Sequence, residues 1–129
     1  MTASFPPKPQ RPTPRAGLLH ILDAAKYSRD GALRLWQETA ARLECGTAVL
    51  AAVLFLFLGA SLRQWLILTA LYLALLMVEA LNTAIEVLTN VVSPHWSIEA
   101  KHAKDLGSLA VGLMLAIIAG YVAAVLLRL

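Results

Sequence analysis

The residues best suited to chemistry lie in one ten-residue stretch, Met77–Glu86, which reads MVEALNTAIE. It places two carboxylates, Glu79 and Glu86, and one amide, Asn82, in an otherwise apolar segment. On an α-helix these three side chains project within about 60° of one another. A carboxylate at membrane depth costs about 2.5 kcal/mol or more, so such groups usually line a site, bind cations or relay protons. Structural hydrogen bonding between helices is the alternative interpretation.

Two further clusters could take part in the same chemistry. AKDLGS, at residues 103–108, pairs the cation Lys104 with the carboxylate Asp105, and a second group combines Glu38, Arg42 and Glu44. Taken alone, the Lys104–Asp105 pair is explained as a charge pair beside a membrane. The group of Glu38, Arg42 and Glu44 is explained as a solvated helix face. Together with Met77–Glu86 they supply carboxylates for divalent cations, a lysine for phosphate and a base, which phosphoryl transfer requires. The sequence has no glycine-rich phosphate loop and no protein-kinase signature, so a nucleotide site here is of an unusual kind.

The elements that must position these clusters are membrane helices. The chain of 129 residues is 59% hydrophobic and only 15% charged, whereas a soluble domain usually carries about 25% charged residues. Residues 45–62 form an uncharged run long enough to cross a bilayer. Residues 64–92 and 106–127 are similarly apolar, and a polar cytoplasmic loop is expected between them at 93–105, with a short helix that continues into the third span. We therefore expect an all-α membrane protein with three transmembrane helices.

The residues before the first span predict two further segments. Residues 17–44 are amphipathic at helical spacing, with basic residues opposite the apolar ones, which is typical of a helix lying in the membrane interface. Residues 1–16 contain five prolines with Lys and Arg between them, so we expect a disordered cytoplasmic tail there.

The distribution of positive charge predicts an orientation in the membrane. Seven of the eleven Lys and Arg residues precede Cys45, and Lys101 and Lys104 lie in the expected loop. This clustering suits an anionic membrane surface, and without interleaved aromatic residues it does not suit nucleic acid. The N-terminus and the loop are therefore expected in the cytoplasm, with Arg63 and the C-terminus on the periplasmic side.

Four segments together carry a family resemblance: AAKYS at 24–28, residues 36–44, EALNTAIE at 79–86 and AKDLGS at 103–108. Through them the chain resembles the prokaryotic integral-membrane diacylglycerol kinases over about residues 18–127. The resemblance implies a homotrimer in the bacterial inner membrane, with a surface helix in each subunit. It also implies Mg²⁺-dependent transfer of the ATP γ-phosphate to diacylglycerol, which gives phosphatidic acid.

The resemblance further implies roles for individual residues. Glu79 matches the general base, Asn82 supports it, and Glu38 and Glu86 match the glutamates that hold metal and ATP. Residues matching the family's ATP contacts are His20, Tyr27, Glu38, Glu86, His95, Trp96, Ser97, Lys104 and Asp105. Residues matching its lipid contacts are Ala24, Ala25, Lys26, Tyr27, Ser28, Arg29, Ala40, Ala41, Arg42, Leu43, Glu44, Glu79 and Ser108. Two positions depart from the pattern: His20 replaces a common arginine, and Asn90 replaces a common aspartate.

Two alternative functions remain open at this point. Related small enzymes phosphorylate undecaprenol, although AKDLGS looks more like the diacylglycerol-specific branch. A small membrane subunit that handles ions or protons also explains buried Glu79 and Glu86. That class has no need of Lys104 and Asp105 or of the Glu38 cluster.

Overall fold

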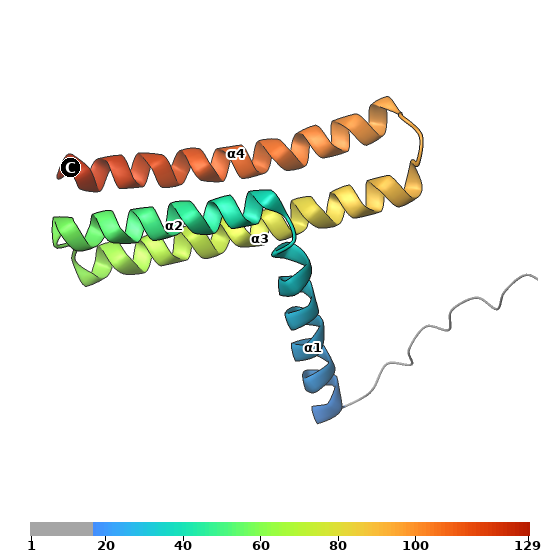
Figure 1. Ribbon diagram of the computed structural model, residues 1–129, viewed down its shortest axis with the longest axis horizontal. Helices are drawn as coiled ribbons and strands as arrows, with labels where there is room; N and C mark the ends of the chain where they lie inside the picture. Colours follow the sequence, from blue (N-terminus) through green and yellow to red (C-terminus); the bar gives the residue numbers. More distant parts are fainter. Residues whose placement is uncertain (1–16) are drawn as a thin grey trace, which may run out of the picture.

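The computed structural model describes residues 17–129, so the tail expected at 1–16 lies outside it. Three helices, α2, α3 and α4, run side by side, and α1 projects from them at a steep angle (Figure 1). Each of these three is long and apolar enough to cross a membrane, which confirms the all-α class with three candidate spans. The bounds are α1 Leu18–Leu35, α2 Thr39–Leu58, α3 Leu62–Val92 and α4 Ile98–Leu126.

The structure differs from the interfacial helix expected over 17–44, because the chain breaks between α1 and α2. Trp36 ends α1, and the backbone of Glu38 is extended, with φ −75° and ψ 133°. This residue is the N-cap of α2, so residues 39–44 belong to the first span and not to the surface helix. The extended residue lets α2 run along the bundle while α1 projects away from it at the start of α2 (Figure 1).

The turn between α2 and α3 is fixed by two capping motifs. Gly59 ends α2 in the left-handed conformation, with φ 64°, and the amide of Ala60 donates to the Phe55 carbonyl at 3.0 Å. Ser61 then starts α3 through a capping box with Gln64. The expected end of the first span at residue 62 is therefore wrong, since Leu62 and Arg63 already belong to α3.

The helix expected within the polar segment at 93–105 begins at Ile98 and continues into the third span as α4, so the loop itself is short. The Ser97 side chain accepts a hydrogen bond from the Ala100 amide at 3.1 Å and caps the helix. Lys101 donates to Asp105 across one helical turn at 2.5 Å. The charged residues of this segment therefore lie on the first turns of α4.

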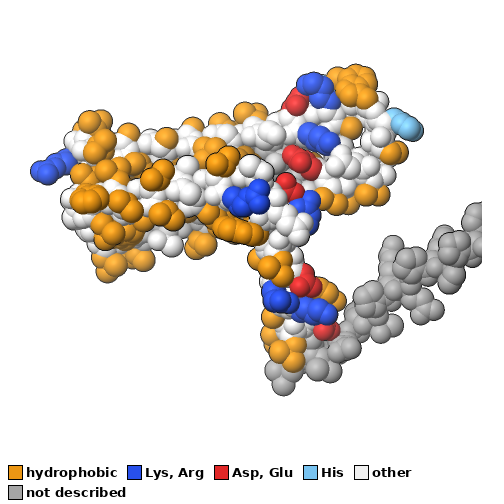
Figure 2. All heavy atoms as spheres, in the orientation of Figure 1, with side chains coloured by type: hydrophobic (Ala, Val, Ile, Leu, Met, Phe, Trp, Pro, Cys, Tyr) orange, Lys and Arg blue, Asp and Glu red, His pale blue; other side chains and the backbone are white. Residues whose placement is uncertain are grey.

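The apolar core lies at the end of the bundle near the Gly59 turn. Phe55 is fully buried and packs against Trp65 and Tyr121, with ring centroids 5.8 and 6.1 Å apart. Elsewhere the bundle presents apolar side chains outward, as a surface facing lipid does. Charged side chains gather around α1 and the end of the bundle beyond it, with a separate basic group at the opposite end (Figure 2).

Candidate active site

The lengths of the helices place one end of the bundle beyond the membrane. α2 has 20 residues and is therefore about 30 Å long, which matches the hydrocarbon core of a bilayer. α3 has 31 residues and α4 has 29. Their extra turns run past the start of α2, toward the loop that joins them (Figure 1). Side chains near Glu79 therefore lie at the level where α2 begins, close to the membrane boundary.

A polar cavity of about 250 Å³, the carboxylate pocket, lies at that level. It brings together the predicted residues Glu38, Glu79, Asn82 and Glu86 with Ser108 of α4. The helical spacing of 79, 82 and 86 places three of these side chains on one face of α3, as the sequence indicated. The remaining lining residues are Ala40, Thr83 and Val111.

The polar groups of the carboxylate pocket are buried to different depths. Glu79 is 3% exposed and Asn82 8%, whereas Glu38 and Glu86 are half-buried. The Asn82 amide donates to Glu86 Oε1 at 3.5 Å. Arg34 of α1 donates to Glu38 Oε1 at 2.5 Å. Glu79 is therefore the enclosed carboxylate, and the two half-buried glutamates face the open side.

Glu44 lies close to this pocket but does not line it. Its side chain is 5% exposed, and its Oε2 has no hydrogen-bond partner within residues 17–129. Ala41, also buried, lies one turn earlier on α2. Arg42 and Leu43 are exposed, and Arg42 donates to the Thr39 hydroxyl at 3.2 Å. The structure therefore divides the predicted lipid segment at 40–44 between the inside and the surface of the bundle.

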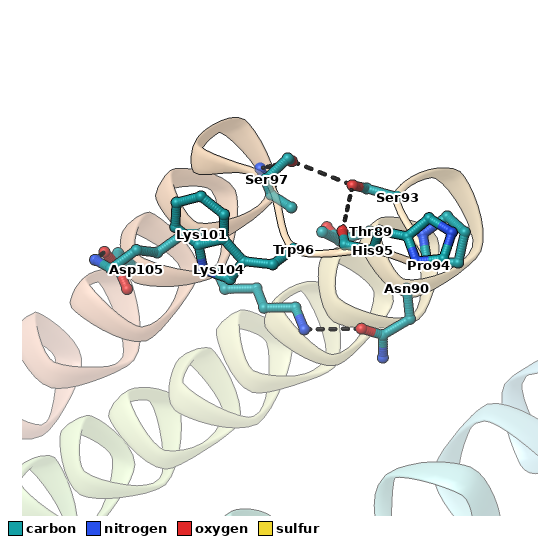
Figure 3. Close-up of a pocket in the computed structure, with 11 residues that line it drawn as sticks. Thr89, Asn90, Ser93, Pro94, His95, Trp96, Ser97, Lys101, Lys104 and Asp105 are labelled. Carbon is teal, nitrogen blue, oxygen red and sulfur yellow. Dashed lines mark hydrogen bonds and ion pairs between the residues drawn. The ribbon is translucent and has the colours of Figure 1, made fainter.

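A second cavity of about 350 Å³, the loop pocket, lies where α3 gives way to α4. His95, Trp96, Ser97, Lys104 and Asp105 line it, so five of the predicted ATP contacts share one cavity. Figure 3 shows the Lys104 ammonium reaching from α4 to α3, where it donates to Asn90 Oδ1 at 2.7 Å. The loop is held by Ser93, whose hydroxyl donates to the His95 carbonyl at 3.0 Å.

The two pockets occupy successive turns along α3 and α4. Glu86 lines the carboxylate pocket and Asn90 the loop pocket, four residues later on α3. Likewise Ser108 and Lys104 are four residues apart on α4. Four residues of helix rise about 6 Å. Lys104 lines the loop pocket and Glu79 the carboxylate pocket, so the two residues lie in neighbouring cavities.

An apolar groove of about 1080 Å³ runs between α1 and α3. Ser28 and Arg34 line it from α1, and Thr83 lines both this groove and the carboxylate pocket. The groove and the carboxylate pocket are therefore adjacent, with Thr83 between them. Other predicted contacts on α1 line none of these three cavities and are exposed: His20, Ala24, Ala25, Lys26, Tyr27 and Arg29.

Several residues of these pockets escaped the sequence analysis. Thr83 has the right spacing, four residues after Glu79, but threonine is common in apolar helices and gave no signal. Arg34 pairs with Glu38 at i,i+4, a spacing that could have indicated it. Lys101 and the loop residues Ser93 and Pro94 line the loop pocket without matching a motif.

Metal ligands are not pre-assembled in the described chain. Within residues 17–129 no three His, Cys, Asp or Glu side chains converge closely enough to hold a metal ion by themselves. The carboxylate pocket nevertheless offers the carboxylate oxygens of the half-buried Glu38 and Glu86. Mg²⁺ is usually bound by one or two carboxylates together with substrate phosphates, so this donor set fits a metal that arrives with a phosphate group.

Comparisons with known proteins agree on one family. Residues 26–127 match the prokaryotic diacylglycerol kinases. A diacylglycerol kinase of Sinorhizobium is 42% identical over 96 residues, covering 74% of this chain and 70% of the relative. One from Haemophilus influenzae is 31% identical over 103 residues, covering 79% and 87% of the two chains. One from Escherichia coli K12 is 33% identical over 96 residues, covering 74% and 79%.

Proposed function

The chain belongs to the family of prokaryotic diacylglycerol kinases, and from this premise we propose that it transfers the ATP γ-phosphate to diacylglycerol. The lipid hydroxyl attacks the γ-phosphorus, the bond to the β,γ-bridging oxygen breaks, and phosphatidic acid and ADP form. The observation that carries the proposal is the enclosed carboxylate of Glu79, in a pocket that shares the lining residue Thr83 with an apolar groove.

Glu79 is the proposed general base. A lipid hydroxyl is a poor nucleophile, and its proton must leave as the phosphoryl group arrives. Glu79 is shielded from water, and Thr83, one turn away, lies at the junction of the pocket with the groove. An acyl chain in the groove brings the glycerol hydroxyl to this junction, where the carboxylate accepts the proton. Ser108 lines the opposite side and can hydrogen-bond the lipid headgroup.

The loop pocket is the proposed site for the ATP phosphates. Lys104 is a point cation there, and its hydrogen bond to Asn90 fixes its direction without neutralising its charge. Charged hydrogen bonds to phosphate are roughly twice as strong as neutral ones. Because the two pockets lie on successive helical turns, a phosphate chain starting at Lys104 extends toward Glu86 and Glu38 in the carboxylate pocket.

Mg²⁺ is the proposed companion of ATP, with Glu38 and Glu86 as its protein ligands; when bound, it supplies charge neutralisation at the phosphates. Arg34 steadies Glu38, and Asn82 steadies Glu86. Glu86→Gln is expected to lose activity and to raise the Mg²⁺ concentration needed for half-maximal turnover, with the fold intact. A Mg²⁺ titration that superimposes on that of the unchanged protein removes Glu86 from this role.

The protein is a multi-pass membrane protein of a bacterial family, and we propose the inner membrane as its location. The basic residues of α1 and the start of α4 lie at the end of the bundle that carries both pockets, while Arg63 and Arg128 lie at the other end. By the positive-inside rule the pockets face the cytoplasm, where ATP is present, and the C-terminus is periplasmic. We also propose that the working unit is a homotrimer.

The test of function is phosphate transfer in mixed micelles. Purified protein is supplied with ATP labelled at the γ-phosphate and with diacylglycerol or undecaprenol in parallel. Label is expected in phosphatidic acid, with little in undecaprenyl phosphate. Preferred labelling of undecaprenol assigns the chain to the other substrate, and no labelling of either lipid rejects the kinase proposal.

A further inference from the structure

α3 and α4 approach each other closely beside the carboxylate pocket, where Gly107 of α4 faces Asn82 of α3. A Cβ placed on Gly107 overlaps the Asn82 amide oxygen and lies 3.2 Å from its Cγ. The six other glycines have nothing within 4 Å at that position. Gly107 is itself buried. Among the described glycines, Gly107 is therefore the one at which an added side chain would collide with another residue.

The contact fixes the direction of the Asn82 amide. Asn82 is 8% exposed, and its Oδ1 has no hydrogen-bond partner within residues 17–129. Buried amide oxygens are normally paired, and here the oxygen lies against the Gly107 backbone, where only weak Cα–H contacts are available. With the oxygen placed there, the Nδ2 end donates to Glu86 Oε1. Asn82 also lines the same cavity as the Glu79 carboxylate, one helical turn away on α3.

We propose that Gly107 is a positioning residue, which seats the Asn82 amide against α4 so that Asn82 holds the Glu79 and Glu86 carboxylates in place. The proposal rests on the catalytic roles assigned to Glu79 and Glu86 above. Gly107 acts only through Asn82 and touches neither lipid nor nucleotide. It adds to the site a residue that carries no chemistry of its own.

Alanine at this position displaces the Asn82 amide. The overlapping atoms are at the end of a short side chain, so the side chain moves while the helices stay in place. The amide then loses its bond to Glu86, and the two carboxylates lose their common support. Misplacement of reacting groups by about 1 Å can cost on the order of 100-fold in rate, so Gly107→Ala is expected to reduce kcat by about 100-fold.

The experiment compares Gly107→Ala with two matched controls on the same helix, Gly112→Ala and Gly120→Ala. Both controls add a methyl group into open space and raise helix propensity, so turnover stays unchanged and thermal stability in detergent is equal or higher. Gly107→Ala is expected to lose turnover and stability. Each variant is assayed for kcat, for the KM values of ATP and diacylglycerol, and for the midpoint of thermal unfolding.

A double substitution separates positioning from a general packing role. In Asn82→Ala the remaining Cβ lies 3.7 Å from the added methyl group, an ordinary contact. Adding Gly107→Ala to Asn82→Ala is therefore expected to cause no further loss of turnover or stability. Equal losses from Gly107→Ala in both backgrounds overturn the proposal, as does unchanged turnover in Gly107→Ala alone.

The test remains decisive if Gly107→Ala fails to fold, and also if the proposed function proves wrong. If Gly107→Ala fails to fold, the proposal requires the Asn82→Ala, Gly107→Ala double variant to recover the fold, and a double variant that also fails counts against it. The comparison of thermal-unfolding midpoints tests the contact between Gly107 and Asn82, and its outcome does not depend on the role of Glu79. Glu79→Gln reports the base alone, so failure of the proposed function is distinguished from failure of the positioning role.

Discussion

At the scale of single residues, Glu79 differs from the other acidic residues in being both enclosed and next to the groove. Replacing it with glutamine keeps the size and polarity but removes the oxygen that accepts the proton. General-base catalysis contributes about 10²- to 10⁴-fold, so Glu79→Gln is expected to lose turnover in that range while ATP still binds. Glu99→Gln, at an exposed position in the first turn of α4, is the control and should behave as the parent. Turnover of Glu79→Gln close to that of the parent, with chemistry rate-limiting, rules out Glu79 as the base.

Asn90 offers a test of the charge at the proposed phosphate site. Its neutral oxygen accepts the bond from Lys104, so the lysine keeps its full charge for phosphate. Asn90→Asp places a carboxylate beside the ammonium, and a partly exposed ion pair is worth up to about 1 kcal/mol, or roughly fivefold in affinity. The KM for ATP should rise by a few-fold at low salt and by less at high salt, because salt screens the pair.

The control for this substitution is Asn90→Ala, which removes the hydrogen bond without adding charge. Its effect on the KM for ATP should not depend on salt. An unchanged or lower KM for ATP in Asn90→Asp at low salt contradicts the assignment of Lys104 to the phosphates.

The sequence identified Glu79, Asn82 and Glu86 because charged and amide groups are rare in an apolar helix. Their spacing sufficed to place them on one face. Gly107 could not be recognised in the same way, since its importance depends on Asn82 lying opposite it on another helix. A glycine in α4 is unremarkable until the partner across the interface is known.

At the scale of elements, the left-handed backbone of Gly59 limits how α2 can end. Its φ of 64° is one that residues with a side chain rarely adopt, at a cost of about 1–2 kcal/mol. Gly59→Ala is therefore expected to lower the thermal midpoint in detergent while activity at moderate temperature is kept, because the turn is at the end remote from both pockets. Gly46→Ala, within α2 and in open space, is the control, and an equal midpoint in both variants argues against strain at Gly59.

The sequence predicted the spans better than their ends. Uncharged length was enough to locate three spans, whereas the ends depend on capping residues that override hydropathy. The Ser61–Gln64 capping box carries α3 through Arg63, and the Ser97 cap starts α4 among charged residues. The break at Glu38 could not be predicted from turn residues, because neither glycine nor proline occurs between Leu35 and Thr39.

At the scale of the whole molecule, charge and apolar surface are separated along the bundle. Apolar side chains cover the part between the two ends, and the charged groups of both pockets lie near α1 and beyond it (Figure 2). We therefore expect the membrane to surround the body of the bundle and, in the proposed orientation, the phosphate chemistry to take place at its cytoplasmic boundary. Under the proposed assignments, a lipid substrate reaches Glu79 from the side of the groove, and a nucleotide reaches the loop pocket from water.

This arrangement leads to a prediction about assembly. Glu86 and Glu38 are only half-buried within one chain, and Glu44 has a buried oxygen without a partner in the described residues. Charged groups cannot face lipid cheaply, and the helices of one chain leave Glu38 and Glu86 partly open. We therefore expect the active form to be an oligomer, a trimer by resemblance, in which neighbouring helices cover the open side of the carboxylate pocket. Native mass measurement in mild detergent should give three chains, and dilution into excess detergent should reduce mass and activity together. Monomers that retain full activity after such dilution contradict the prediction.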